Sequence, residues 1–84
     1  MGLPILKWEK INSTNIKRTS WIPEEDPEAD GGNMYVDFHS GWMYVYFEVP
    51  SEVYDAFKKA PSRGKFHAQH IKWKYDYSVL NKKK

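Results

Sequence analysis

Apolar and polar positions alternate on both sides of a single turn signal near the middle of the chain, in the stretch NMYVDFHSGWMYVYFEVP at 33–50. Ser40 and Gly41 suit a two-residue turn, because Gly readily takes the positive φ that such turns require. The pattern therefore predicts a β-hairpin over about 33–49.

A turn at these two residues sorts the hairpin side chains onto two faces, since side chains alternate along a strand. One face is wholly apolar: Met34, Val36, Phe38, Met43, Val45 and Phe47. The other face is aromatic and polar, with the pairs His39 and Trp42, Asp37 and Tyr44, and Tyr35 and Tyr46. We expect the apolar face to pack inward and the aromatic face to point away from the core.

Four apolar residues after the hairpin recur at helical spacing: Val53, Ala56, Phe57 and Ala60. They predict an amphipathic helix over about 51–60, whose apolar stripe is the natural partner of the hairpin's apolar face. A short helix at about 65–71 follows, and alternation predicts a C-terminal strand at about 73–79.

Two shorter strands are expected before the hairpin, at about 3–11 and 16–22. The segment 23–32 holds two prolines, two glycines and five acids, which is the composition of a flexible, solvated loop. Residues 81–84 form a basic tail that we expect to be frayed. The chain is thus predicted to be one α+β domain over 1–84, built on a small antiparallel sheet.

Composition indicates the cellular compartment in which the protein is expected. The chain has no Cys, so disulfides cannot support its small core and a reducing compartment is favoured. It contains neither the apolar core of a signal peptide nor the run of about 20 apolar residues that spans a membrane. We therefore expect a soluble, cytoplasmic protein that does not associate with membranes.

Charge is distributed unevenly along the chain. From Lys58 onward there are nine basic residues and a single acid, Asp76. A basic region of this kind attracts phosphates and anionic nucleotides. The alternative is a Lys-rich surface that serves only solubility, as on many small proteins.

A series of short motifs links the elements in a distinctive order: Ser13-Thr14 with Ile16, Tyr44 with Tyr46, Val49-Pro50, Val53-Tyr54, Ala60, Ser62 with Gly64, Phe66, Ile71, and Tyr75 with Tyr77. In this order the chain resembles the KTSC domain over about 12–80. That short module is named for its place at the C-terminus of some lysyl-tRNA synthetases, and it also occurs as a stand-alone bacterial or phage protein.

The chain departs from the family pattern at three places: Trp21 in place of Tyr, the acidic segment 23–32, and His67-Ala68 in place of Phe-Asn. The resemblance implies a small α+β fold, a role in nucleic-acid binding and no catalytic residues. At the last departure this chain lacks the Asn on which a function of the family could rest.

The aromatic face of the hairpin is the main candidate site. Its predicted binding residues are Tyr35, Trp42, Tyr44 and Tyr46, with Tyr75 and Tyr77 as further candidates. Aromatic rings on a sheet can stack bases without demanding a sequence. Four cations in neighbouring segments could meet phosphates: Arg63, Lys65, Lys72 and Lys74. Alternatively, the first strand, the last strand or a second copy of the chain covers these rings, or they are exposed singly.

Three other motifs give weaker indications of a binding or catalytic site. The turn at 62–65 could bind an anion at a helix start, or simply use Gly64 to join two helices. His67 and His70 have the spacing of a metal pair, but no third ligand stands at a recognisable distance, so we predict no metal site and no cofactor. The clustered acids lie in the predicted loop, which could not hold catalytic carboxylates in place.

We therefore expect a small non-enzymatic module that binds nucleic acid or a nucleotide. The alternative is a protein-interaction role, as a phage-type inhibitor or as an oligomer that sequesters a signalling nucleotide between its subunits.

Overall fold

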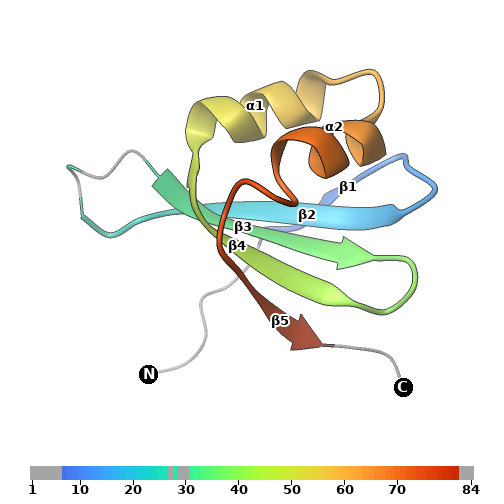
Figure 1. Ribbon diagram of the computed structural model, residues 1–84, viewed down its shortest axis with the longest axis horizontal. Helices are drawn as coiled ribbons and strands as arrows, with labels where there is room; N and C mark the ends of the chain where they lie inside the picture. The colour runs from blue at the N-terminus through green and yellow to red at the C-terminus, as the bar shows by residue number, and fades with distance from the viewer. Residues whose placement is uncertain (1–6, 27, 29–30, 82–84) are drawn as a thin grey trace.

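A computed structural model describes residues 7–26, 28 and 31–81, in which one antiparallel sheet is packed against two helices (Figure 1). The strands are arranged in chain order: β1 (Glu9–Lys10), β2 (Ile16–Pro23), β3 (Gly31–Phe38), β4 (Met43–Pro50) and β5 (Tyr77–Asn81). The helices α1 (Ser51–Lys59) and α2 (Arg63–His70) lie on the same face of the sheet. The predicted α+β fold is confirmed.

The hairpin of β3 and β4 turns through three residues instead of the predicted two. The Phe38 N–H donates to the Trp42 carbonyl at 2.9 Å, and the Gly41 N–H donates to the Phe38 carbonyl at 3.0 Å. Gly41 takes a φ of 101°, as the last residue of such a loop requires. The prediction of a two-residue turn at Ser40 and Gly41 is therefore wrong.

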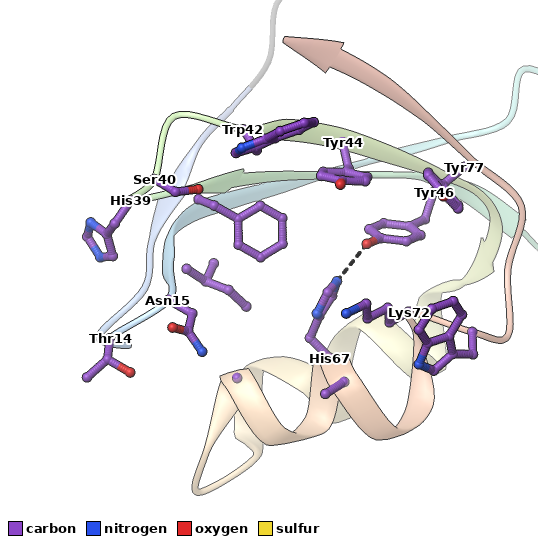
Figure 2. Close-up of a pocket in the computed structure, with 15 residues that line it drawn as sticks. Thr14, Asn15, His39, Ser40, Trp42, Tyr44, Tyr46, His67, Lys72 and Tyr77 are labelled. Atoms are coloured by element: carbon purple, nitrogen blue, oxygen red, sulfur yellow. Dashed lines mark hydrogen bonds between the residues drawn. The ribbon is translucent and has the colours of Figure 1, made fainter. Parts of the chain in front are cut away.

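The longer loop shifts the strand register by one residue, so that Val36 pairs with Tyr44 and Met34 pairs with Tyr46. A shift of one residue moves every side chain of a strand to the opposite face. Tyr44 and Tyr46 consequently lie on the face that the helices cover, and the hydroxyl group of Tyr46 meets α2 (Figure 2). The expected outward-facing aromatic surface does not form.

The same shift corrects the expected core. Met34 and Val36 of β3 and Phe57 of α1 are fully buried between the sheet and the helices, as predicted, but Val45 pairs with Tyr35 on the far face of the sheet. Val45 is only 4% exposed there, whereas Met43 and Phe47 are half-buried. Tyr46, at 2% exposed, takes the place in the core that the sequence pattern assigned to its apolar neighbours.

A bulge in β4 brings the end of that strand back into the core. The pairing shifts between Gly32 and Met34, and Glu48 takes a φ of 56° in the strand opposite. The extra residue returns Val49 to the helix-covered face, where it is fully buried. The Trp21 ring then packs directly on Gly32, where any Cβ would lie 2.6 Å from the ring.

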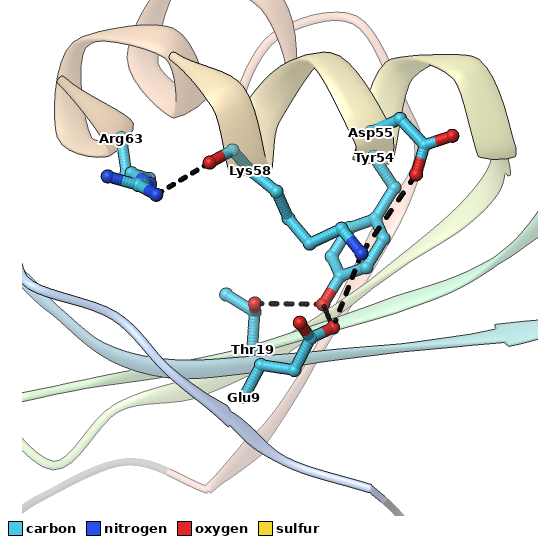
Figure 3. Close-up of polar contacts among 6 residues, drawn as sticks. All are labelled: Glu9, Thr19, Tyr54, Asp55, Lys58 and Arg63. Atoms are coloured by element: carbon cyan, nitrogen blue, oxygen red, sulfur yellow. Dashed lines mark hydrogen bonds and ion pairs between the residues drawn. The ribbon is translucent and has the colours of Figure 1, made fainter. Parts of the chain in front are cut away.

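α1 is confirmed almost at its predicted bounds, and Tyr54 connects it to the sheet (Figure 3). The Tyr54 hydroxyl donates to Glu9 Oε1 at 2.9 Å and accepts from Thr19 Oγ1 at 3.1 Å. Lys58 Nζ lies 3.7 Å from the same carboxylate oxygen. This cluster joins β1 and β2 to the helix, and burial raises the pKa of Tyr54 to about 12.

The C-terminal strand begins later than predicted. Residues 71–76 form turns after α2, with the Lys74 N–H donating to the Ile71 carbonyl at 3.2 Å, and β5 starts only at Tyr77. Ile71 is fully buried and Trp73 is 82% exposed, so the alternation over 73–79 reflects a turn followed by an edge strand. The predicted short helix is confirmed as α2, which begins two residues earlier than expected.

The observed bounds of the other segments also differ from the predicted ones. Of the strand expected at 3–11, the structure shows β1 and places residues 1–6 outside the described part. Pro23 and Gly31–Gly32 belong to strands, which shortens the acidic connection, while residues 27, 29 and 30 lie outside the described part. Asn81 ends β5, and 82–84 are not described. No helix in the described part is long and apolar enough to cross a membrane.

Replacing Gly41 by Ala should lower the free energy of unfolding by about 1–2 kcal/mol, because a Cβ is strained at positive φ. Gly41→Asn should lower the free energy of unfolding by less, since Asn adopts the left-handed region more readily than Ala. Urea unfolding measures both changes. Equal stability of Gly41→Ala and the parent chain would contradict the backbone conformation at this loop.

Replacing Tyr54 by Phe should cost about 1–3 kcal/mol of stability, because the buried Thr19 hydroxyl loses its partner. The exposed Tyr77 makes no hydrogen bond through its hydroxyl within the described part, so Tyr77→Phe is the matched control. Urea unfolding of the two variants should differ. The cluster has no stabilising role if both retain the parent stability.

Candidate ligand-binding pocket

A pocket of about 490 Å³ opens between α2 and the sheet, beside the hairpin loop (Figure 2). Aromatic rings from the sheet and the turn after α2 form its walls: Phe38, Trp42, Tyr44, Tyr46, Trp73 and Tyr77. Polar residues gather at the hairpin end: Thr14, Asn15, His39 and Ser40. Helix α2 adds Gly64, His67 and Ala68, and Lys72 follows it in the chain. We call this cavity the α2 pocket.

The rings along β4 are packed against one another before any ligand arrives. Tyr44 stacks on Tyr46 with ring centres 6.1 Å apart, and it lies 5.4 Å from Tyr77 of β5. Trp42 and Phe38 approach the same ring at 6.2 Å and 5.6 Å. Tyr44 is thus held on several sides, which fixes its orientation in the pocket wall.

His67 and Tyr46 form a polar pair in the interior of the α2 pocket. His67 Nε2 and the Tyr46 hydroxyl lie 2.8 Å apart, and His67 is only 6% exposed. Burial, assisted by the positive charge of Lys72, lowers the pKa of His67 from 6.5 to about 4. Burial also raises the pKa of Tyr46, with Tyr44 and Tyr77 adding to the effect. Both groups are therefore uncharged at neutral pH.

The polar end of the pocket is fixed by the loop that precedes β2. Ser13 Oγ accepts the N–H groups of Asn15 and Ile16 at 3.2 Å each. The loop is tied to the hairpin as well, because the His39 N–H donates to the Asn15 carbonyl at 3.0 Å and His39 Nε2 meets the Ser13 carbonyl at 3.0 Å. These bonds fix the backbone of Asn15 at the end of the pocket.

The structure brings together half of the predicted site residues. Trp42, Tyr44, Tyr46 and Lys72 all line the α2 pocket, although the three rings lie on the helix-covered face of the sheet and not on the expected outward face. Tyr35 is separated from them by the sheet, because it pairs with Val45 on the far face. The predicted grouping of these rings with Tyr35 is wrong for that reason.

Three of the four predicted cations do not line the pocket. Arg63 Nη2 donates to the Lys58 carbonyl at 2.6 Å, at the junction of the two helices. Lys65 and Lys74 are exposed and lie outside the pocket lining. Lys72 alone among them reaches it, and its Nζ lies 5.1 Å from the centre of the Trp73 ring.

Several pocket residues were not assigned to a binding site by the sequence. The sequence suggests His67 as half of a metal pair with His70 or as a general base, both without support, and the structure buries His67 and exposes His70. Among the described residues, no group of three or more His, Cys, Asp or Glu side chains could hold a metal ion. The buried position of His67 follows from its spacing to Ile71, which marks the covered face of α2.

Comparison with known proteins places the chain in a family. The sequence profile of the KTSC domain matches residues 12–75, which is most of the chain. The chain belongs to the KTSC domain family. The resemblance identified from the sequence motifs is therefore confirmed.

Relatives of this KTSC domain include segments of larger proteins. It is 36% identical over 62 residues to a lysine–tRNA ligase of Trichormus variabilis, covering 74% of this chain and 11% of the relative. A second relative, a lysine–tRNA ligase of Nostoc punctiforme, is 31% identical over 81 residues, which are 96% of this chain and 13% of that protein. The chain thus spans only about a tenth of these curated relatives.

A solved structure has the same fold. The crystal structure of a KTSC domain protein from Yersinia pestis superposes with a TM-score of 0.76, covering 90% of this chain and 99% of that one. Its sequence identity to this KTSC domain is 23%, so this likeness concerns the fold alone.

The low pKa of His67 makes stability dependent on pH. The folded protein holds this ring neutral down to about pH 4, whereas the unfolded chain protonates it near pH 6.5, so the unfolded state binds more protons between those values. The contribution of neutral His67 to the free energy of unfolding is fully present above pH 6.5. Below pH 6.5 the free energy of unfolding should fall by up to about 1.4 kcal/mol per pH unit.

Urea unfolding between pH 7.5 and pH 5 measures this slope. His67→Gln should flatten it, and the exposed His70→Gln should keep the parent slope, since only His67 is buried. Identical slopes in the parent chain and His67→Gln would show that the ring is not held neutral.

Proposed function

We propose that this KTSC domain is a non-enzymatic binding module that holds a nucleobase in the α2 pocket, presented by a nucleotide or by single-stranded nucleic acid. The supporting observation is the row of packed rings around Tyr44, which faces a cavity with a lysine at its edge. Base–aromatic stacking contributes about 1–3 kcal/mol per base and is tolerant of sequence.

The polar groups of the pocket suit recognition better than chemistry. His67 would be the natural general base, but its Nε2 is engaged with Tyr46 and its ring packs edge-on against Phe38 at 5.4 Å. A buried, neutral pair of this kind presents a fixed dipole to a ligand and holds the tyrosine in place. This arrangement favours binding over proton transfer.

The relatives add a reason to include RNA among the ligands tested. Proteins named lysine–tRNA ligase contain a segment similar to this chain. RNA is therefore one of the ligands that we propose for this KTSC domain.

A protein-interaction role is the second candidate, because the large apolar residues that the described part exposes gather at one edge. They are Trp73, Tyr77, Val79 and Leu80, in or just before the edge strand β5. An exposed apolar edge strand is a template for another chain. A second copy or another protein on this edge would make the module an inhibitor or an oligomer, including one that sequesters a nucleotide between subunits.

Fluorescence titration can test the binding proposal, since Trp42 and Trp73 line the α2 pocket. The probes are the four ribonucleoside 5′-monophosphates and a short single-stranded RNA. We expect Tyr44→Ala to weaken binding of the best probe roughly tenfold or more, through loss of stacking. Tyr77→Ala should weaken it as well, and this ring is exposed enough for its loss to leave the core intact.

Tyr35→Ala provides the matched comparison, because it removes a tyrosine from the far face of the same sheet. It should leave the affinity within about twofold of the parent. Loss of binding in Tyr35→Ala, with Tyr44→Ala and Tyr77→Ala unaffected, would place the site on the other face. If no probe binds and light scattering shows a stable oligomer, the interaction role is favoured instead.

A further inference from the structure

We propose that the α2 pocket takes a nucleoside monophosphate, with its base toward Asn15 and its phosphate at Lys72, and that it does not take a nucleic-acid strand. This inference rests on the proposed function and narrows it to one ligand class. It follows from the charge of the pocket, the polarity of its two ends and the chain segments that meet at one of them.

The pocket supplies one permanent cation. Among the described residues that line it, Lys72 is the only Lys or Arg. The buried His67 is neutral at physiological pH and cannot act as a second one. Sites for single strands instead use a basic groove that follows the backbone over several phosphates. One cation matches one phosphate group.

At the Asn15 end of the pocket three chain segments lie against one another, and we expect them to obstruct a continuing strand. The loop before β2 is bound to the hairpin by the His39 N–H and by the contact of its ring with the Ser13 carbonyl. Gly64 of α2 approaches the same loop, since a Cβ there would lie 3.5 Å from Ser13 Oγ. A volume of about 490 Å³ is also typical of a small-ligand site.

The ends of the pocket differ in chemistry, which gives a ligand a direction. Figure 2 shows Asn15 at one end and Lys72 at the other, with Tyr44 on the sheet wall across the pocket from α2. The Asn15 side chain makes no hydrogen bond within the described part, so its amide can both donate to and accept from a base edge. A base stacked on Tyr44 then extends its phosphate toward Lys72.

Three matched probes test this inference by fluorescence titration: a nucleoside, its 5′-monophosphate and a short single strand of the same base. The monophosphate should bind about tenfold more tightly than the nucleoside, because it gains one charged contact. Lys72→Gln should abolish this difference, and Lys59→Gln, at an exposed position on α1, should preserve it. The affinity of the monophosphate should fall only weakly as the salt concentration rises, because one ion pair is merely screened, whereas a strand held through several phosphates would lose affinity steeply.

The outcomes separate this inference from the proposed function. A single strand that binds more tightly than the monophosphate, with a steeper salt slope, would overturn the inference while leaving base binding in the pocket intact. Equal binding of the nucleoside and the monophosphate would also overturn it, since Lys72 would then contact no phosphate. If none of the three probes binds, the proposed function itself fails.

Discussion

The hydroxyl group of Tyr46 is buried at the interface between the sheet and α2, and a phenol in that position must find a hydrogen-bond partner. His67 supplies it, which fixes the rotation of α2 about its axis and its height above β4. Tyr54 meets the same requirement on α1 through Thr19 and Glu9. Both helices are thus placed by tyrosines whose rings fill the core while their hydroxyls require specific polar partners, a specificity that apolar side chains alone would not provide.

The sequence predicts most of the elements but not how the two hairpin strands face each other. α1 is well predicted because its apolar residues follow one helical stripe between clear boundary residues. From Trp42, just before β4, to Phe47 within it, every residue is apolar or aromatic, so either alternation gives a credible core face. Only the loop length decides between them, and Gly41 fits both a two-residue and a three-residue turn.

The candidate site was only partly predictable for the same reason. The aromatic residues could be recognised as a group, yet their face depended on the register, so Tyr35 was assigned to a site on the wrong side of the sheet. The positions of the cations could not be derived from charge. Arg63 and Lys65 lie in the first turn of α2, which starts two residues earlier than expected, and Lys72 and Lys74 lie in the turns at 71–76, where side-chain directions follow no simple period. Lys72 lines the pocket while Lys74, two residues later, does not.

The α2 pocket and the exposed sheet edge share a residue, which couples the two candidate functions. Tyr77 lines the pocket, contacts Tyr44 and Tyr46, and lies on the outermost strand with about half of its surface exposed. A chain added to β5 would lie beside this ring and alter the solvent access of the pocket wall. Conversely, a ligand stacked in the pocket would order Tyr77 and with it the strand that a partner would use. Binding in the pocket and association at the edge would therefore influence each other, with the sign set by whether both favour the same position of Tyr77.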